Sequence, residues 1–267
     1  MIHEELLGAF TAHQRGRGLS RKTTARRLIS VGQFSRAIEP VSLTDATPEL
    51  VELWVFRFKT SATKRAYRSD LQAFYSWAVR HKITTCNPVD STDPIRVPKS
   101  LPRPVAPSWL PAILDAAEPD VRLMIALAAY AGLRVAEISA LEKSDVDLLS
   151  DAPTLAVRDG KGSKDRIVPV HADLALMLAG RAPGRLVPVC ANTISTKVAR
   201  HLRALGIDAT AHKLRHSFGS ELARTTSGNV VLVAKLMGHE SIQTTMGYIG
   251  WAGGPGADAV AAMYPAA

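Results

Sequence analysis

The sequence predicts a mainly α-helical protein with one small β-hairpin or sheet, divided into two domains. Three observations support this fold class. Apolar residues recur at helical spacing through most of the chain, two short β-type runs lie between residues 154 and 170, and a proline-rich stretch separates two blocks. The chain has 267 residues, of which 46% are hydrophobic, enough for two packed cores. We place the domains at residues 1–93 and 108–267, joined by a linker at residues 94–107.

The charge of the chain favours a polyanionic partner. The 33 Lys and Arg residues outnumber the 24 Asp and Glu residues, which gives a formal net charge of +9. Nucleic acid is the leading candidate, although a protein can equally be basic for solubility alone. Most of the excess lies in residues 1–98, so this part of the chain is the better candidate for a DNA grip.

The composition argues against several other classes of protein. No stretch reaches the ~20 apolar residues needed to cross a bilayer, and the N-terminus lacks the pattern of a signal peptide. We therefore expect a cytoplasmic protein with no membrane partner. Cys86 and Cys190 have no CxxC spacing and indicate neither a disulfide framework nor a zinc site, so we expect no metal and no cofactor.

The first domain is predicted to be a bundle of helices that are basic near their starts. "EELLGAF" forms one helix, and a second begins with Ser20 as its N-cap and runs through "SRKTTARRLISVGQFSRAIE". A third runs through "SATKRAYRSDLQAFYSWAVRHK", with Ser61 as its cap. Basic helix starts suit a clamp around a duplex, although most charged helix faces are only solvated. The candidates for DNA contacts, from these helices and the linker, are Lys22, Arg26, Lys64, Arg65, Arg68, Lys99 and Arg103.

Proline density defines the linker. Seven of the 16 prolines lie between Pro88 and Pro111, where they prevent a continuous helix or a central strand. The segment is therefore expected to be extended. It carries Lys99 and Arg103, so it could follow a phosphate backbone between the domains, but a solvated spacer is the commoner structure for such a segment.

The second domain is predicted to be helical around the β-type runs. After "SWLPAILDAA", a buried helix runs from about Val121 to Ala131 and stops at Gly132, and "RVAEISAL" forms a short helix. "TLAVR" and "RIVPV" form two strands joined by the turn "DGKGSKD". Helices then follow at about residues 191–205, 212–225 and 229–237.

Two motifs of the second domain carry arginines suited to bind a phosphate. In "AGLRVAEISAL", Arg134 begins a helix after the Gly132 stop, and Glu137 lies on the same helical side, where it can orient the guanidinium. In "AHKLRHSFGSELA", His212 and Arg215 share one helix face and offer donors to an anion. Each motif alone is weak evidence, because Gly-Leu-Arg turns are common and an isolated His-Arg pair is more often structural.

Two further motifs add a lysine, a histidine and a tyrosine. Lys161 lies between glycines in "DGKGSKDRIVPV", so its loop can approach a ligand closely; Lys164 is a rival, and a lysine in a turn is usually only solvated. "GHESIQTTMGYIG" carries His239 and Tyr248. A free phenol has a pKa near ~10, so Tyr248 can attack a phosphate only where its surroundings draw off the proton and stabilise the charge.

Six residues together supply the groups that phosphoryl transfer needs when no metal takes part. They offer several cationic or neutral donors, a proton donor and one hydroxyl nucleophile. The candidate catalytic residues are Arg134, Lys161, His212, Arg215, His239 and Tyr248.

At these motifs the sequence resembles the tyrosine recombinases, also called phage integrases. "AGLRVAEISAL", "GKGSKDRIVPV", "HKLRHSF" and "LMGHESIQTTMGYI" match in order and spacing the family's first arginine, hairpin lysine, His-x-x-Arg box and histidine-to-tyrosine segment. More loosely, the resemblance covers nearly the whole chain. It implies a helical core-type DNA-binding domain at residues 1–93 and a tyrosine-recombinase catalytic domain with a C-terminal tail at residues 108–267. The family often has Thr at Ala131 and a polar residue at Gly247, departures that remove no catalytic group.

The resemblance implies a site-specific recombinase or integrase that cuts and rejoins DNA. Tyr248 is then the nucleophile of a 3′-phosphotyrosyl intermediate, the arginines and histidines stabilise the transition state, and Lys161 protonates the departing 5′-oxygen. The implied partners are double-stranded DNA core sites, a homo-tetramer on two DNA sites and an accessory directionality factor. We expect recognition of a short core site only, because the residues before Ser20 are too few to bury a core of their own.

Two other interpretations remain open at this point. A type IB topoisomerase would share the phosphotyrosyl chemistry but act as a monomer that relaxes supercoils, and the short tail and two-domain clamp fit it less well. A non-enzymatic DNA-binding protein would explain the charge of the chain but would not need the six candidate catalytic residues.

Overall fold

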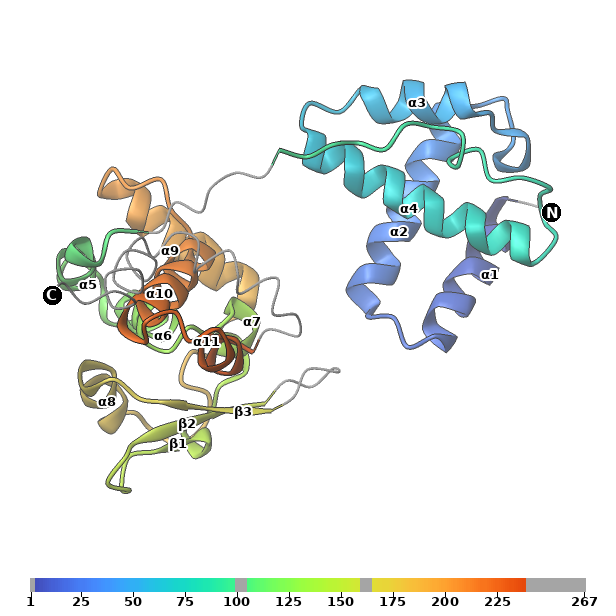
Figure 1. Cartoon of the computed structure of the whole chain (residues 1–267). Coiled ribbons are helices and arrows are strands. Elements are labelled where there is room, and N and C mark those ends of the chain that lie inside the picture. Colours follow the sequence, from blue (N-terminus) through green and yellow to red (C-terminus); the bar gives the residue numbers. More distant parts are fainter. Residues whose placement is uncertain (1–2, 99–104, 159–164, 239–267) are drawn as a thin grey trace, which may run out of the picture. The chain divides into compact units, whose positions relative to one another are not determined.

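The computed structural model describes residues 3–98, 105–158 and 165–238, and the chain divides into two compact units, Met1–Ser100 and Leu101–Ala267 (Figure 1). Both units are mainly helical, and the second also contains a three-stranded sheet, which confirms the predicted fold class. The bounds of the linker and the roles of the two domains stay predictions. None of the helices in the described residues is long and apolar enough to span a membrane.

Unit 1 is a helical bundle around an aromatic core. Its described α-helices are α1 (His3–Gly16), α2 (Arg21–Ala37), α3 (Pro48–Phe56) and α4 (Ser61–Arg80), with the 3-10 turn η1 (Leu43–Asp45) before α3. Phe10 of α1 meets the ring of Phe74 of α4 edge to face, with ring centres 5.3 Å apart. Phe34 of α2 meets Trp54 of α3 in the same way at 5.2 Å. Edge-to-face pairs of this kind add to the apolar area that the bundle buries.

The starts of α2 and α4 test the predicted caps. Ser20 caps α2 as predicted, because its hydroxyl accepts a hydrogen bond from the N–H of Thr23 at 3.0 Å. The cap of α4 is Thr60, so the prediction of Ser61 was wrong by one residue. Thr60 has the extended backbone of a cap and accepts from the N–H of Thr63 at 3.1 Å, whereas Ser61 is already helical.

Two of the predicted DNA contacts in unit 1 also donate hydrogen bonds within the unit. Arg68 donates through Nε to Thr92 Oγ1 and through Nη2 to the carbonyls of Val89 and Thr92, each at 2.9 Å. Arg26 donates to the buried carboxylate of Asp70 at 2.7 Å. The remaining candidates of this unit lie at its surface, exposed or half-buried: Lys22, Lys64 and Arg65. Lys99 and Arg103 lie outside the described residues.

Unit 2 is built around one helix whose central residues are all buried. Its described helical elements are η2 (Pro107–Trp109), α5 (Leu110–Asp115), α6 (Pro119–Tyr130), α7 (Val135–Ala140), η3 (Lys143–Asp145), α8 (Ala172–Ala179), α9 (Ala191–Ala204), α10 (Ala211–Thr225) and α11 (Val230–Met237). Residues 123–129 of α6 are all buried, and α6 packs against α5, α7, α8, α9 and α10. A helical segment that is apolar on every side can only be stable inside such a shell.

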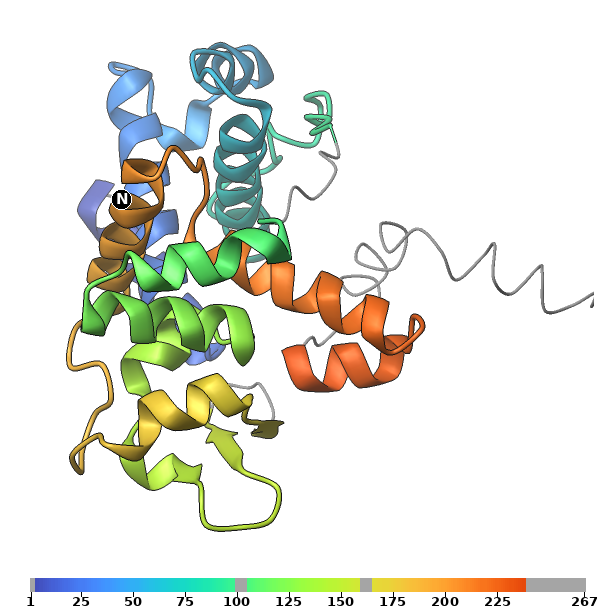
Figure 2. The same ribbon diagram turned by 90° about the vertical axis from the view of Figure 1, so that its left-hand side faces the viewer.

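The sheet lies at one end of unit 2, beside α8 (Figures 1 and 2). Its strands β1 (Val146–Asp147), β2 (Thr154–Val157) and β3 (Arg166–Pro169) are antiparallel in that order. Leu155 of β2 pairs with Val168 of β3, and both side chains are buried. The two predicted strands are therefore present, while β1 and α8 were not predicted.

Two glycines end the helices that lead to the site. Gly132, after α6, has φ +63°, and a Cβ added there would lie 2.4 Å from a ring carbon of Phe218 on α10. Gly238, after α11, has φ +62°. Left-handed backbone of this kind stops a helix and favours glycine, so the predicted stop at Gly132 is confirmed and Gly238 ends α11 in the same way. α10 and α11 then pack side by side (Figure 2).

Arg68→Ala should destabilise unit 1 by about 1–3 kcal/mol, because the buried carbonyl of Val89 loses a charged donor and the segment up to Thr92 loses its anchor. Arg65→Ala is the matched control: Arg65 is exposed on the same helix, and its loss should change stability by less than about 0.5 kcal/mol. Urea denaturation of both variants measures this difference. Equal stabilities would show that the hydrogen bonds of Arg68 contribute nothing.

Candidate active site

The site begins where the chain turns from α6 into α7. Arg134 is the N-cap of α7, with an extended backbone at φ −72° and ψ 152°. Its N–H donates to Oε2 of Glu137 at 2.7 Å, and its Nη1 donates to Oε1 of the same carboxylate at 2.8 Å. Glu137 therefore orients this guanidinium as the spacing predicted. The Arg134 side chain remains 38% exposed, so it can still reach a ligand.

Glu137 also binds two arginines that come from distant parts of the chain. Arg166, the first residue of β3, meets it in a two-pronged ion pair, Nη1 to Oε1 and Nη2 to Oε2, both at 2.9 Å. Nη1 of Arg215, from α10, lies 3.5 Å from Oε2. The side chain of Glu137 is only 5% exposed, and those of Arg166 and Arg215 are 5% and 3% exposed. One buried carboxylate thus joins three guanidiniums.

The electrostatics of this cluster keep Glu137 ionised. Burial acts to raise the pKa of Glu137, but the hydrogen bonds from Arg166 and from the Arg134 backbone, with the charges of Arg166 and Arg215, outweigh it and lower the pKa below its ordinary value of 4.5. With one negative and three positive charges, the cluster has a net charge of about +2 at neutral pH. It is therefore built to attract an anion.

The same three arginines bind the carbonyls at the end of α11. Arg166 Nε donates to the carbonyl of Leu236 at 2.9 Å, Arg134 Nη2 donates to that of Gly238 at 2.7 Å, and Arg215 binds that of Met237. Helix C-termini carry partial negative charge, so these contacts are favourable. They fix the point from which the chain continues toward Tyr248.

Arg215 and Arg166 pack closely against the ends of α6 and α11. Arg215 also binds the carbonyl of Gly132, so one buried side chain links the ends of α6 and α11. A Cβ on Gly238 would lie 2.8 Å from Nη1 of Arg166. Both the left-handed backbone and this close approach require glycine at position 238.

His212 lies beside the arginines, in the first turn of α10. Its Nε2 is 2.9 Å from Nε2 of His216, one helical turn later. Burial, followed by the charges of Arg215 and Arg134, lowers the pKa of His212 below 6.5. His212 is therefore mainly neutral near pH 7, when one of its nitrogens is a donor and the other an acceptor.

A basic cavity extends from this point across the surface of unit 2. It has a volume of about 860 Å³ and lies between the start of α7, the side of α9 and the start of α10. Arg134 and His212 line it, and α9 contributes the exposed Arg200 and Arg203. A cavity lined by these three arginines matches a phosphate backbone better than an apolar ligand.

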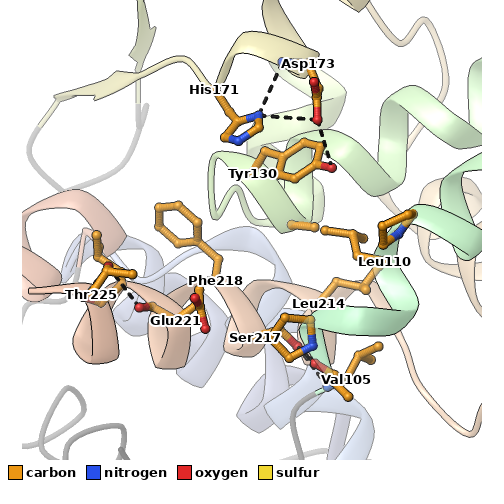
Figure 3. A pocket seen from close by; sticks show the side chains of 15 residues that line it. Val105, Leu110, Tyr130, His171, Asp173, Leu214, Ser217, Phe218, Glu221 and Thr225 are labelled. Atoms are coloured by element: carbon orange, nitrogen blue, oxygen red, sulfur yellow. Dashed lines mark hydrogen bonds and ion pairs between the residues drawn. The ribbon is translucent and has the colours of Figure 1, made fainter.

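A second cavity of unit 2, of about 460 Å³, is mainly apolar (Figure 3). Leu110, Leu214 and Phe218 form much of its wall, and Tyr130 stacks on His171 at its edge with ring centres 4.5 Å apart. Its lining includes none of the three arginines that share Glu137. Of these two cavities, the basic one is therefore the better candidate for binding an anion.

The structure brings together three of the six predicted catalytic residues, namely Arg134, His212 and Arg215. Lys161, its rival Lys164, His239 and Tyr248 lie outside the described residues. Sequence analysis missed Arg166. The signal was in the alternation of β3, where Arg166 and Val168 both face inward, so that an arginine occupies a position expected to be apolar.

The chain matches the model of a known protein family. A model of the phage integrase family matches residues 105–252, which is more than half of the chain. The chain belongs to the phage integrase family and is a tyrosine recombinase. The tyrosine recombinase XerC of Myxococcus xanthus is 28% identical, over 91% of this chain and 92% of the relative. The tyrosine recombinase XerA of Thermococcus kodakarensis is 32% identical, over 58% of this chain and 60% of the relative.

Solved structures share the fold at low sequence identity. A lambda integrase dimer (residues 75–356) bound to a core site gives a TM-score of 0.77 at 20% identity, covering 93% of this chain and 95% of that one. A lambda integrase tetramer bound to a Holliday junction gives 0.72 at 21% identity, covering 89% and 77%. At these identities the likeness describes the fold alone.

Glu137→Gln should destabilise unit 2 by about 3–5 kcal/mol near pH 7, because three guanidiniums lose the buried charge that pairs with them. The folded pKa of Glu137 lies below 4.5, so its contribution is present above about pH 4.5 and is lost as the pH falls. The difference from wild type should therefore shrink in acid. Urea denaturation at several pH values measures it.

Glu221→Gln is the control for this prediction, because Glu221 forms an exposed ion pair with Arg224. Its loss should cost less than about 1 kcal/mol. A Glu137→Gln variant as stable as the control would contradict the central role of the Glu137 carboxylate.

Proposed function

We propose that this tyrosine recombinase cuts and rejoins DNA strands at specific sites through a 3′-phosphotyrosyl intermediate. The observation that carries the proposal is the joining of Arg134 and Arg215 by one buried carboxylate, beside His212 and at the end of α11. Tyr248 follows in the sequence from that helix end. Family membership supports the same assignment.

In the proposed reaction the phenol of Tyr248 gives up its proton to solvent as its oxygen attacks a DNA phosphodiester in line. The bond between phosphorus and the 5′-oxygen breaks, Lys161 gives that oxygen a proton, and a 3′-phosphotyrosine and a 5′-hydroxyl result. Arg134, Arg215, His212 and His239 stabilise the additional negative charge on the phosphate oxygens. Attack by the 5′-hydroxyl of another strand reverses the step, and the ester conserves the bond energy.

The arginines contribute to this reaction in different ways. Arg134 is partly exposed and lines the basic cavity, so it offers hydrogen-bond donors directly to a phosphate oxygen. Arg215 is buried and binds the ends of two helices, so it contributes a positive charge held at a fixed position. A charge held in a desolvated place acts strongly on a nearby transition state.

We further propose double-stranded DNA core sites as the substrate and four copies of the chain on two sites as the active assembly. Solved complexes of related fold hold a core site and a Holliday junction, which supports this choice. In the chain itself, Arg200 and Arg203 extend the basic cavity away from Arg134. Unit 1 is the proposed core-type DNA-binding domain. Because the proposed substrate of the enzyme is DNA, we expect it to act in the cytoplasm. The accessory directionality factor stays a prediction.

Tyr248→Phe should bind DNA like wild type but form no covalent adduct, because only the hydroxyl is lost. The measurement uses DNA nicked near the crossover, so that cleavage releases a short fragment and traps the protein on the DNA. Denaturing electrophoresis then detects the adduct. An adduct that persists in Tyr248→Phe would refute the assignment, and site-independent relaxation of plasmids would favour a topoisomerase.

Lys161→Ala should cut ordinary DNA slowly but recover most of its rate when the leaving 5′-oxygen is replaced by sulfur, since a thiolate departs without a proton. Lys164→Ala is the matched control and should show the same rate relative to wild type on both substrates. Single-turnover cleavage measures all four rates. Equal defects of Lys161→Ala on both substrates would make it only a source of charge, and selective recovery of Lys164→Ala would transfer the role to Lys164.

A further inference from the structure

His216 contacts the proposed catalytic histidine but has no role in the reaction described so far. It lies on α10 one turn after His212, and the two rings meet edge to face with centres 4.4 Å apart and an angle of 81° between their planes. Their Nε2 atoms are 2.9 Å apart, the distance of a hydrogen bond. His216 is half-buried, whereas His212 is exposed at the basic cavity.

We propose that His216 is a positioning residue, which holds the imidazole of His212 so that its Nδ1 is directed to the DNA phosphate. The inference rests on the proposed function. A hydrogen bond between two Nε2 atoms uses that nitrogen on both rings. Nδ1 is then the nitrogen of His212 that is left for a substrate.

The contact also restricts the proton on His212. Between two Nε2 atoms there is room for one proton, so one ring donates and the other accepts. When both rings are neutral and His216 donates, His212 carries its proton on Nδ1 and can donate it to a phosphate oxygen. When His212 gains a second proton, His216 accepts from its Nε2, and Nδ1 of His212 is still a donor. Both of these states present an N–H to the anion.

Burial and the surrounding charges keep His216 available as a neutral partner. Burial, followed by the charges of His212 and Arg215, lowers the pKa of His216 to about 4. The charged groups that act on His212 are Arg215 of the same helix and Arg134 at the start of α7, and Arg200 and Arg203 of α9 line the same cavity. These described groups are all cationic, so a second positive charge on the histidine pair is opposed.

A neutral partner suits a pocket that binds phosphate. In many enzymes a carboxylate orients the catalytic histidine and favours its charged form. Here a carboxylate at the position of His216 would repel the substrate and partly cancel the charge of the nearby arginines. An imidazole orients His212 through the same kind of hydrogen bond without a negative charge.

The test is a double-mutant cycle on single-turnover cleavage of the nicked DNA. His216→Ala should slow cleavage about 10-fold or more, as the loss of a partner that orients an active-site histidine commonly does. In the background of His212→Ala the same change should have no further effect, because His216 acts only through His212. His216→Gln places a polar group near the former Nε2 and should recover most of the rate.

His171→Ala is the matched control. It also removes an imidazole, one that stacks on Tyr130 and accepts from the N–H of Asp173 at the start of α8. It should leave the cleavage rate unchanged even where it lowers the melting temperature as much as His216→Ala does. A slowing equal to that of His216→Ala would indicate general destabilisation and overturn the proposal.

A second readout does not depend on catalysis. Nitrogen-15 NMR of the imidazole rings should show that His216→Ala changes the shifts of Nε2 and Nδ1 of His212, and that His171→Ala does not. Unchanged shifts, or an equal slowing by His216→Ala with and without His212, would overturn the proposal. Absence of any adduct with wild type would instead overturn the proposed function, while the NMR result would still decide whether His216 sets the proton on His212.

Discussion

The site depends on the buried carboxylate of Glu137. Without it, three guanidiniums from the start of α7, from β3 and from α10 would lie close together in a region with little water, where like charges repel strongly. With it, each guanidinium has a fixed partner, and the cluster still keeps an excess of positive charge. Glu137 is therefore what allows a cationic site to exist inside a stable fold.

Backbone carbonyls at the ends of two helices also hold the three arginines in place. Arg215 binds the carbonyl of Gly132 after α6, and all three arginines bind carbonyls at the end of α11. These carbonyls have no partner within their own helices, so the arginines satisfy them while the helix dipoles favour the positive charge. Because residues 123–129 of α6 are all buried, the core of unit 2 fixes the position of this network. The packing of the core therefore determines the geometry of the site.

The sequence could predict those parts of the site that are encoded by local spacing. Arg134 and Glu137 are three residues apart on one helix, as are His212 and Arg215, so their shared faces follow from helical periodicity. Arg166 could not be placed in this way, because its contacts depend on how β3 meets α7 and α11. The first residue of a helix was also hard to predict from local sequence. Thr60 and Ser61 are both good caps, and the backbone of the folded chain decides between them.

Local pattern also could not separate binding residues from structural ones. Arg68 looked like its neighbour Arg65, a basic residue near the start of a helix, yet its guanidinium holds the segment that follows α4. Such contacts join residues far apart in the sequence. The same applies to the short strand β1, whose two residues carry too little periodicity to be recognised without the partner strand that they meet.

The charge of the cluster is suited to the transition state more than to the substrate. Three guanidiniums and one carboxylate give about +2, and His212 adds a hydrogen-bond donor with little charge because its pKa is lowered. A DNA phosphodiester carries one negative charge. In the proposed reaction the attacking oxygen of Tyr248 brings about one more as it loses its proton. The pocket therefore gains more Coulomb energy from the transition state than from bound DNA, which is the condition for binding energy to accelerate a reaction.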